Sequence, residues 1–210
     1  MKRYQKLSVS LALPGVLAAL WALPAVAHHP FGAQTPNSSW QGLLAGLGHP
    51  VIGSDHFVFV VALGLLAALL RWGVAIPVVF VLSTVAGTGL HLAALNIPAV
   101  EMSVSASVLG LGILLAVVNR PPVGWIAGFA VLAGLFHGYA YGEAIVGAEM
   151  SPLAAYLVGF SLIQIAIAAA AYSLAQKMQR SADSDRLNLR FAGFAVAGFG
   201  AALLTSRLSG

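Results

Sequence analysis

Long apolar runs constrain the fold of this chain more than any other feature of its sequence. A helix needs about 20 predominantly apolar residues to cross a bilayer core of about 30 Å. Charged residues make up 8% of the chain, whereas a soluble domain has about a quarter. We therefore predict an all-α integral membrane protein with six transmembrane helices. The expected spans are residues 40–70, 74–95, 100–118, 123–141, 152–175 and 189–208.

Residues 1–27 are predicted to be a cleavable signal peptide. Three basic residues precede an apolar stretch at 7–23, and Ala25-Val26-Ala27 offers a small-x-small cleavage site. An uncleaved first transmembrane helix is the alternative. With cleavage, residues 28–39 form a short periplasmic segment and residues 40–210 form the six-helix transmembrane domain.

The mature chain would then begin with His28 and His29. The free amine and imidazole of His28 can chelate a metal ion, with His29 beside them. An exposed tail without function is the alternative, because terminal residues are often poorly ordered. The chain contains no cysteine, so any metal must be held by His, Asp, Glu, Met or backbone oxygen.

A polar motif interrupts the first apolar run. Residues 49–56 read His-Pro-Val-Ile-Gly-Ser-Asp-His within a run of 31 residues, which as one helix would be about 46 Å long. We expect a first segment to end near Gly48, since Pro50 lacks a backbone donor. Asp55 at mid-membrane costs about 3 kcal/mol unless it has a partner or a cavity. Two imidazoles and a carboxylate at a helix break suit a divalent transition metal.

The fourth span ends in a second polar cluster, His-Gly-Tyr-Ala-Tyr-Gly-Glu at residues 137–143. Counting residues along the spans places every embedded histidine in the outer half of the bilayer. A glycine-terminated helix with interfacial tyrosines is the alternative for this cluster, and hydrogen-bonded packing is the alternative for a lone histidine. The candidate metal ligands are His49, Asp55, His56, His137, Glu143 and His91, with His28 and His29 at the mature N-terminus.

The charges predict the orientation of the chain. With the mature N-terminus outside, outer loops carry acidic residues and inner loops carry Arg71, Arg120, Lys177, Arg180, Arg186 and Arg190. Cytoplasmic loops carry such an excess of Lys and Arg. We expect a bacterial inner membrane protein with both mature termini periplasmic and with a solvated inner connector at 176–188. The basic residues lie at membrane edges, so the net charge of +4 gives no nucleic-acid signal.

Glycines recur at a spacing that lets transmembrane helices approach closely. Gly42 and Gly46 form one such pair, and Gly124 and Gly128 form another. Small residues at every fourth position typically mark helix–helix contacts in membranes. We interpret both pairs as packing positions without a further function.

The two polar motifs resemble those of the HupE/UreJ family of membrane proteins. His49-Pro-x-x-Gly-x-Asp55-His56 is similar to the family's first motif, and Phe136-His137-Gly-Tyr-Ala-Tyr-Gly-Glu143 is similar to its second. The second motif commonly has a histidine where this chain has Tyr141. The resemblance implies a nickel or cobalt permease associated with hydrogenase or urease maturation.

The favoured function is a secondary permease that takes Ni²⁺, or Co²⁺, across the membrane through an outer-half site. Cu²⁺ and Zn²⁺ suit the same ligands, because affinity alone does not select nickel. We expect no enzymatic activity, since no His-Glu-x-x-His motif is present. The alternatives are a metalloenzyme and a membrane-embedded assembly factor that holds metal without moving it. The sequence does not define an oligomeric state.

Overall fold

The computed structural model describes residues 34–179 and 184–209, and these form helices without a strand. The elements are α2 (Ser39–Ile52), α3 (Ser54–Ala67), α4 (Ala75–Leu92), α5 (Val100–Ala116), α6 (Val123–Gly142), the 3-10 turn η1 (Glu143–Ile145), α7 (Met150–Gln179) and α8 (Ser184–Ser209). The predicted signal peptide and the first half of the segment 28–39, residues 28–33, lie outside the described residues. The all-α prediction is confirmed for the part described.

Four helices of the described chain are long and apolar enough to cross a membrane: α4, α6 with η1, α7 and α8. The pair α2 and α3 meets the same test as one unit, with a bend of 78° between the two helices. The remaining apolar helix, α5, has 17 residues and spans about 25 Å. The chain is therefore a multi-pass membrane protein, and the number of six spans stays a prediction.

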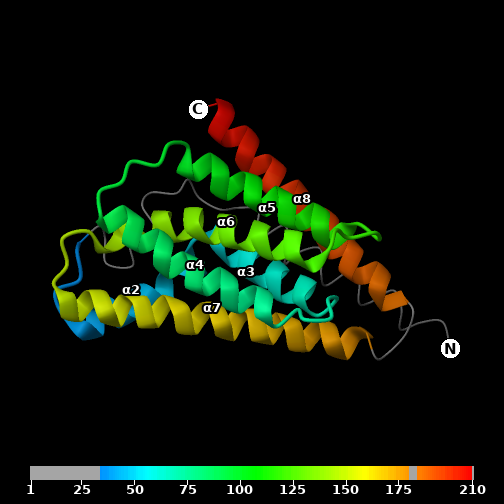
Figure 1. The fold of residues 1–210 in the computed structure, drawn as a ribbon, viewed down its shortest axis with the longest axis horizontal. Helices are drawn as coiled ribbons and strands as arrows, with labels where there is room; N and C mark the ends of the chain where they lie inside the picture. The colour runs from blue at the N-terminus through cyan, green and yellow to red at the C-terminus, as the bar shows by residue number, and fades with distance from the viewer. Residues whose placement is uncertain (1–33, 180–183, 210) are drawn as a thin grey trace, which may run out of the picture.

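The helices pack in three long pairs (Figure 1). In this view α2 and α7 line one side of the bundle, α5 and α8 line the other, and α4 and α6 lie between them. Gly134 and Gly138 of α6 contact Phe80 and Thr84 of α4, so these two helices are parallel. Apolar α3 contacts α4, α5, α7 and α8, which makes it the interior helix of the bundle.

The break in the first span lies at Gly53, five residues beyond the predicted end of its first segment. Pro50 is accommodated inside α2, and the backbone N–H of Gly53 still donates to the carbonyl of His49 at 3.1 Å. Pro50 thus removes only its own hydrogen bond, and the helix continues to Ile52. The prediction that α2 ends near Gly48 is wrong for this reason.

The predicted connector at 176–188 is shorter than expected. α7 continues to Gln179 and α8 begins at Ser184. The side-chain amides of Gln176 and Gln179 donate to the carbonyl of Ala68, at 3.3 and 3.2 Å. Polar residues extend α7 because they supply donors to the C-terminal end of α3, whose last carbonyls have no partner within the helix.

One of the two predicted glycine pairs is a packing contact. A Cβ atom at Gly42 or Gly46 would overlap the backbone of α7, so those glycines allow close approach. Gly124 and Gly128 have no neighbouring atom within 4 Å among the described residues. The packing prediction is wrong for the second pair within this chain, because that face of α6 is turned outward.

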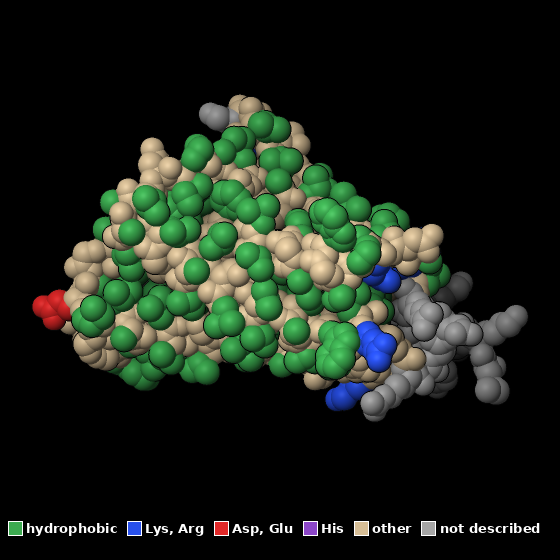
Figure 2. All heavy atoms as spheres, viewed as in Figure 1, with side chains coloured by type: hydrophobic (Ala, Val, Ile, Leu, Met, Phe, Trp, Pro, Cys, Tyr) green, Lys and Arg blue, Asp and Glu red, His purple; other side chains and the backbone are tan. Residues whose placement is uncertain are grey.

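The two ends of the bundle differ in the charged side chains that they carry. Figure 2 shows hydrophobic side chains over the viewed face, with Lys and Arg gathered at one end and an acidic side chain at the other. Arg207, at the end opposite the other basic residues that the structure describes, forms an ion pair with Glu101. This pair joins the last turn of α8 to the first turn of α5, as antiparallel packing of the two helices requires.

Two glycines of α4 give a matched test of the packing. A Cβ atom at Gly87 would overlap the carbonyl oxygen of Leu135, whereas one at Gly89 meets no atom within 4 Å. We expect Gly87→Ala to lower the free energy of unfolding by about 1–3 kcal/mol through overpacking. Gly89→Ala should change it by no more than about 1 kcal/mol. Denaturation of the purified protein in detergent measures both, and equal losses would contradict the parallel contact of α4 with α6.

Candidate functional site

Three histidines from different helices meet at the bend between α2 and α3. His49, His56 and His137 are all buried, with 3%, 2% and 0% of their surface exposed. The ring centroids of His49 and His56 are 5.7 Å apart, and those of His56 and His137 are 4.9 Å apart. The fold thus brings together both predicted polar motifs, which are 81 residues apart at the His56–His137 contact.

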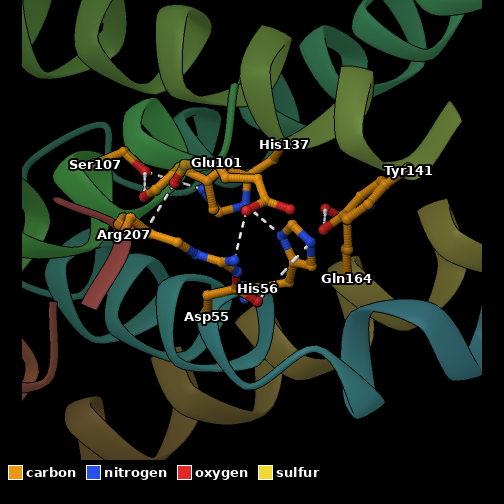
Figure 3. Close-up of polar contacts among 10 residues, drawn as sticks. Asp55, His56, Glu101, Ser107, His137, Tyr141, Gln164 and Arg207 are labelled. Atoms are coloured by element: carbon orange, nitrogen blue, oxygen red, sulfur yellow. Dashed lines mark hydrogen bonds and ion pairs between the residues drawn. The ribbon is translucent and has the colours of Figure 1, made fainter. Parts of the chain in front are cut away.

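A chain of polar contacts runs through this cluster (Figure 3). The Nδ1 atoms of His56 and His137 lie 2.8 Å apart, within hydrogen-bond distance. His137 Nε2 lies 2.9 Å from Ser107 Oγ, and His56 Nε2 lies 3.9 Å from Asp55 Oδ1. Both imidazoles therefore turn Nδ1 toward each other and Nε2 toward an oxygen atom.

The hydrogen-bond network assigns the protons of the neutral pair. Ser107 Oγ donates its single proton to the carbonyl of Val104 at 2.7 Å, so it accepts from His137 Nε2–H. His137 Nδ1 is then the unprotonated nitrogen of that ring. It accepts from His56 Nδ1–H. Ser107 thereby fixes which nitrogen of His137 faces the cluster.

Gly53 positions His56. A Cβ atom at Gly53 would lie 2.6 Å from His56 Cδ2, so a larger residue there would displace the imidazole. The next residues begin α3, where Asp55 lies in the first turn and accepts the backbone N–H of His56 at 2.9 Å. A carboxylate is favourable at this place because it faces the positive end of the helix dipole.

Aromatic rings surround the histidines. Tyr141, which is fully buried, lies 5.0 Å from His49 and 4.6 Å from His56 between ring centroids. Phe59 lies 4.5 Å from His137 and stacks on Phe80 at 4.9 Å. Phe59 follows His56 by one turn toward the C-terminal end of α3. The rings of Phe59 and Phe80 therefore close the cluster on that side.

A second set of buried polar groups adjoins Tyr141. Its hydroxyl donates to Gln164 Oε1 at 3.5 Å, and Gln164 Nε2 lies 3.4 Å from Thr84 Oγ1. Gln164 also donates to the carbonyl of Phe160 at 3.0 Å, and Tyr156 donates to the carbonyl of Tyr141 at 2.8 Å. These contacts hold α4, α6 and α7 together beside the histidines.

The other predicted ligands do not join the cluster. His91 packs against Tyr139 at 4.5 Å, and its buried Nδ1 has no hydrogen-bond partner among the described residues. Glu143 begins η1 with an exposed side chain. His28 and His29 lie outside the described residues.

Within the part of the chain that the structure describes, no three His, Cys, Asp or Glu side chains are arranged to hold one ion together. The direct hydrogen bond between His56 and His137 explains in part why three such side chains do not converge. His56 directs its two ring nitrogens to opposite sides, toward His137 and toward Asp55. One ion placed between the imidazoles would not reach the Asp55 carboxylate in its present position.

Comparison with known proteins identifies the family. The model of the HupE / UreJ protein family matches residues 16–203. The chain is 32% identical over 204 residues to protein HupE of Rhizobium leguminosarum bv. viciae, covering 96% of this chain and 98% of the relative. The chain belongs to the HupE/UreJ family. No solved structure matches it significantly.

Sequence reasoning missed Ser107 in this HupE/UreJ protein. The residue is one of three serines at alternate positions 103, 105 and 107 near the start of α5. Nothing in their spacing distinguishes the one that faces His137. Only the packing of α5 against α6 determines which serine contacts His137. A cavity of about 240 Å³ lies beside Ser107 and is lined by Phe129 and Phe136 among others.

Ser107→Ala should leave His137 Nε2–H without its acceptor. We expect a loss of about 1–3 kcal/mol in the free energy of unfolding, the usual cost of an unsatisfied buried donor. Nitrogen NMR of labelled histidines should show that His137 no longer holds one tautomer. Ser105→Ala is the matched control, because that buried hydroxyl donates only within its helix, to the carbonyl of Glu101. An unchanged His137 signal in Ser107→Ala would contradict the assigned network.

Proposed function

We propose that this HupE/UreJ protein is a secondary permease for a divalent transition metal, with Ni²⁺ first and Co²⁺ second. The supporting observation is the arrangement of His56 and His137, whose Nδ1 atoms converge while their Nε2 atoms face Asp55 and Ser107. Histidines that ligate metals almost always direct the other ring nitrogen to a carboxylate, carbonyl or water. Both histidines follow that general pattern, with a serine hydroxyl in one case.

The metal would replace the proton between the two imidazoles. Imidazole nitrogens bind at about 2.0–2.1 Å, so two of them at right angles on one ion lie about 3 Å apart. The observed separation is 2.8 Å. On binding, the proton of His56 would move to Nε2, toward the carboxylate of Asp55. His49, whose ring faces that of His56, would supply a third nitrogen after a small rotation.

This assignment divides the predicted ligands into two groups. His49, His56 and His137 bind the ion, and Asp55 orients His56 by accepting from its outer nitrogen. His91 and Glu143 lie outside this centre and act, with His28 and His29, in capture of the ion before it reaches the histidines. Nitrogen ligands favour Ni²⁺, Co²⁺, Cu²⁺ and Zn²⁺ over Mg²⁺.

Passage beyond the histidines requires a rearrangement. Phe59 and Phe80 cover the cluster on the side toward the C-terminal end of α3, and hydrophobic constrictions of this kind can act as gates in membrane pores. The chain carries no ATP-binding loop. The energy for uptake would therefore come from an ion gradient or from trapping of the metal after passage.

The charge distribution supports uptake into the cytoplasm. The end of the bundle with Lys and Arg would face the cytoplasm, and the opposite end, which carries the predicted outer termini, would face the periplasm of a bacterial inner membrane. Nickel delivered there would serve the maturation of a hydrogenase or a urease, as the family resemblance suggests.

A second candidate function is metal binding without transport. The aromatic closure by Phe59 and Phe80 favours it, because both rings pack against His137 and cover one side of the cluster. The protein would then hold its ion for an assembly system, and the same histidines would serve as ligands.

Uptake of radiolabelled nickel into cells separates these functions. We expect His56→Ala and His137→Ala to lose uptake by at least about tenfold, since each removes a ligand worth about 10–100-fold or more in affinity. His91→Ala should reduce uptake less than either of these variants, because His91 lies outside the cluster and only assists capture of the ion. Metal retained by the purified protein without uptake in cells would establish the binding function instead. Equal loss in His91→Ala would contradict the assigned centre.

Tyr141 offers a test by gain of a ligand. Its ring contacts His49 and His56, at the position where the resembling family commonly has histidine. We expect Tyr141→His to raise nickel retention by the purified protein, because it adds an imidazole beside the other two. Tyr141→Phe removes only the hydroxyl that contacts Gln164 and should leave retention unchanged. Weaker retention in Tyr141→His than in Tyr141→Phe would place the ion elsewhere.

A further inference from the structure

A basic cavity lies at the end of the bundle opposite Glu101 and Arg207. Its volume is about 450 Å³, and the residues that line it belong to α7 and α8 and to the segments that follow α3 and α5. They are Leu69, Val117, Val118, Arg120, Gln179, Leu187 and Arg190. Among these described residues two are arginines and none is acidic, which is the chemistry of an anion site with apolar walls.

Both arginines are held in place by the C-terminal end of α5. Arg120 donates to the carbonyls of Leu114 and Leu115 at 3.1 Å, and Arg190 donates to the carbonyl of Ala116 at 2.9 Å. These bonds order both guanidinium groups, and the bond of Arg190 does not cancel its charge, because a carbonyl carries no net charge. The bond of Arg190 uses one of the five N–H donors of its guanidinium.

An apolar groove adjoins the basic cavity. It has a volume of about 460 Å³ and runs along α5 and α8, lined by Ile113, Ala116, Phe194 and Ala197 among others. Val117, Val118 and Arg190 line both spaces, so the two are contiguous. A basic cavity that continues into an apolar groove matches the two parts of a phospholipid.

The position of the cavity along the axis of the bundle also fits a lipid headgroup. Trp72 follows α3 and Trp125 lies in the first turn of α6 at this same end, and they are 69% and 76% exposed. Exposed tryptophans of this kind mark the interface between membrane and water. In Figure 2 the Lys and Arg side chains gather at this end of the molecule.

We propose that this cavity and groove bind an anionic phospholipid. The phosphate of the headgroup lies against Arg120 and Arg190, and one acyl chain follows the groove between α5 and α8. Basic pockets between transmembrane helices on the cytoplasmic side bind anionic headgroups in this way. A free phosphate would use the arginines but would leave the groove uncovered. The site is separate from the histidines, so the inference does not depend on metal transport.

Binding to the full-length protein in detergent tests this proposal. Phosphatidylglycerol and phosphatidylcholine with the same acyl chains are added in turn, and bound lipid is counted by native mass spectrometry. We expect phosphatidylglycerol to bind at least about fivefold more tightly, with a similar loss in Arg120→Gln or Arg190→Gln, since one basic residue near a lipid surface contributes about 1 kcal/mol. Arg71→Gln is the matched control, because Arg71 is exposed at the same end and does not line the cavity.

Several results would overturn the proposal. Equal binding of the two lipids, or equal loss in Arg71→Gln, would show only attraction to a basic surface. Displacement of the lipid by millimolar inorganic phosphate would show a phosphate site without a role for the groove. Phe194→Ser, which alters the groove without adding a charge beside Arg190, should weaken phosphatidylglycerol binding and leave phosphate binding unchanged. Thermal unfolding of each variant without lipid shows that it is folded, and Arg190→Lys keeps the charge if Arg190→Gln does not fold.

Discussion

The bond between His56 and His137 is the interaction on which the interior of this protein depends. An imidazole in an apolar interior needs partners for its polar nitrogens, because a buried unsatisfied group costs about 1–3 kcal/mol. The two rings pair here at their Nδ1 atoms, and Ser107 Oγ accepts from Nε2–H of His137. The contact fixes the positions of α3, α5 and α6 relative to one another, since each contributes one member of the chain. Close approach of α6 to α4 at Gly138 then places His137 within reach.

Much of the fold could be predicted because bilayer thickness sets helix length. The apolar runs predicted helices α4, α5 and α6, and the ends of these helices in the structure lie within a few residues of the predicted ones. Which helices are neighbours could not be predicted. Parallel contact of α4 with α6 depends on glycines at matching heights, and single glycines in a sequence with 23 of them do not reveal their partners.

The candidate site could be predicted as a pair of motifs but not as a geometry. His49, Asp55, His56 and His137 come together, whereas Glu143 lies beyond the last turn of α6 with an exposed side chain. Its distance from His137 in sequence is six residues, which on a helix points it away from the same face. Ser107 could not be identified, because a serine on an apolar helix most often donates back to its own carbonyls, as Ser105 does.

The direct pairing of His56 with His137 bears on how the protein would work. A site built only to retain metal gains nothing from a second stable arrangement of its ligands. Here His56 and His137 satisfy each other directly when no ion lies between them. An ion must therefore compete with a formed hydrogen bond, which lowers its affinity but lets the ligands close again when it leaves. Conduction needs binding that is weak enough for release as well as strong enough for capture. A polar pair that alternates between self-pairing and metal binding meets both requirements, and this favours passage of the ion over permanent retention.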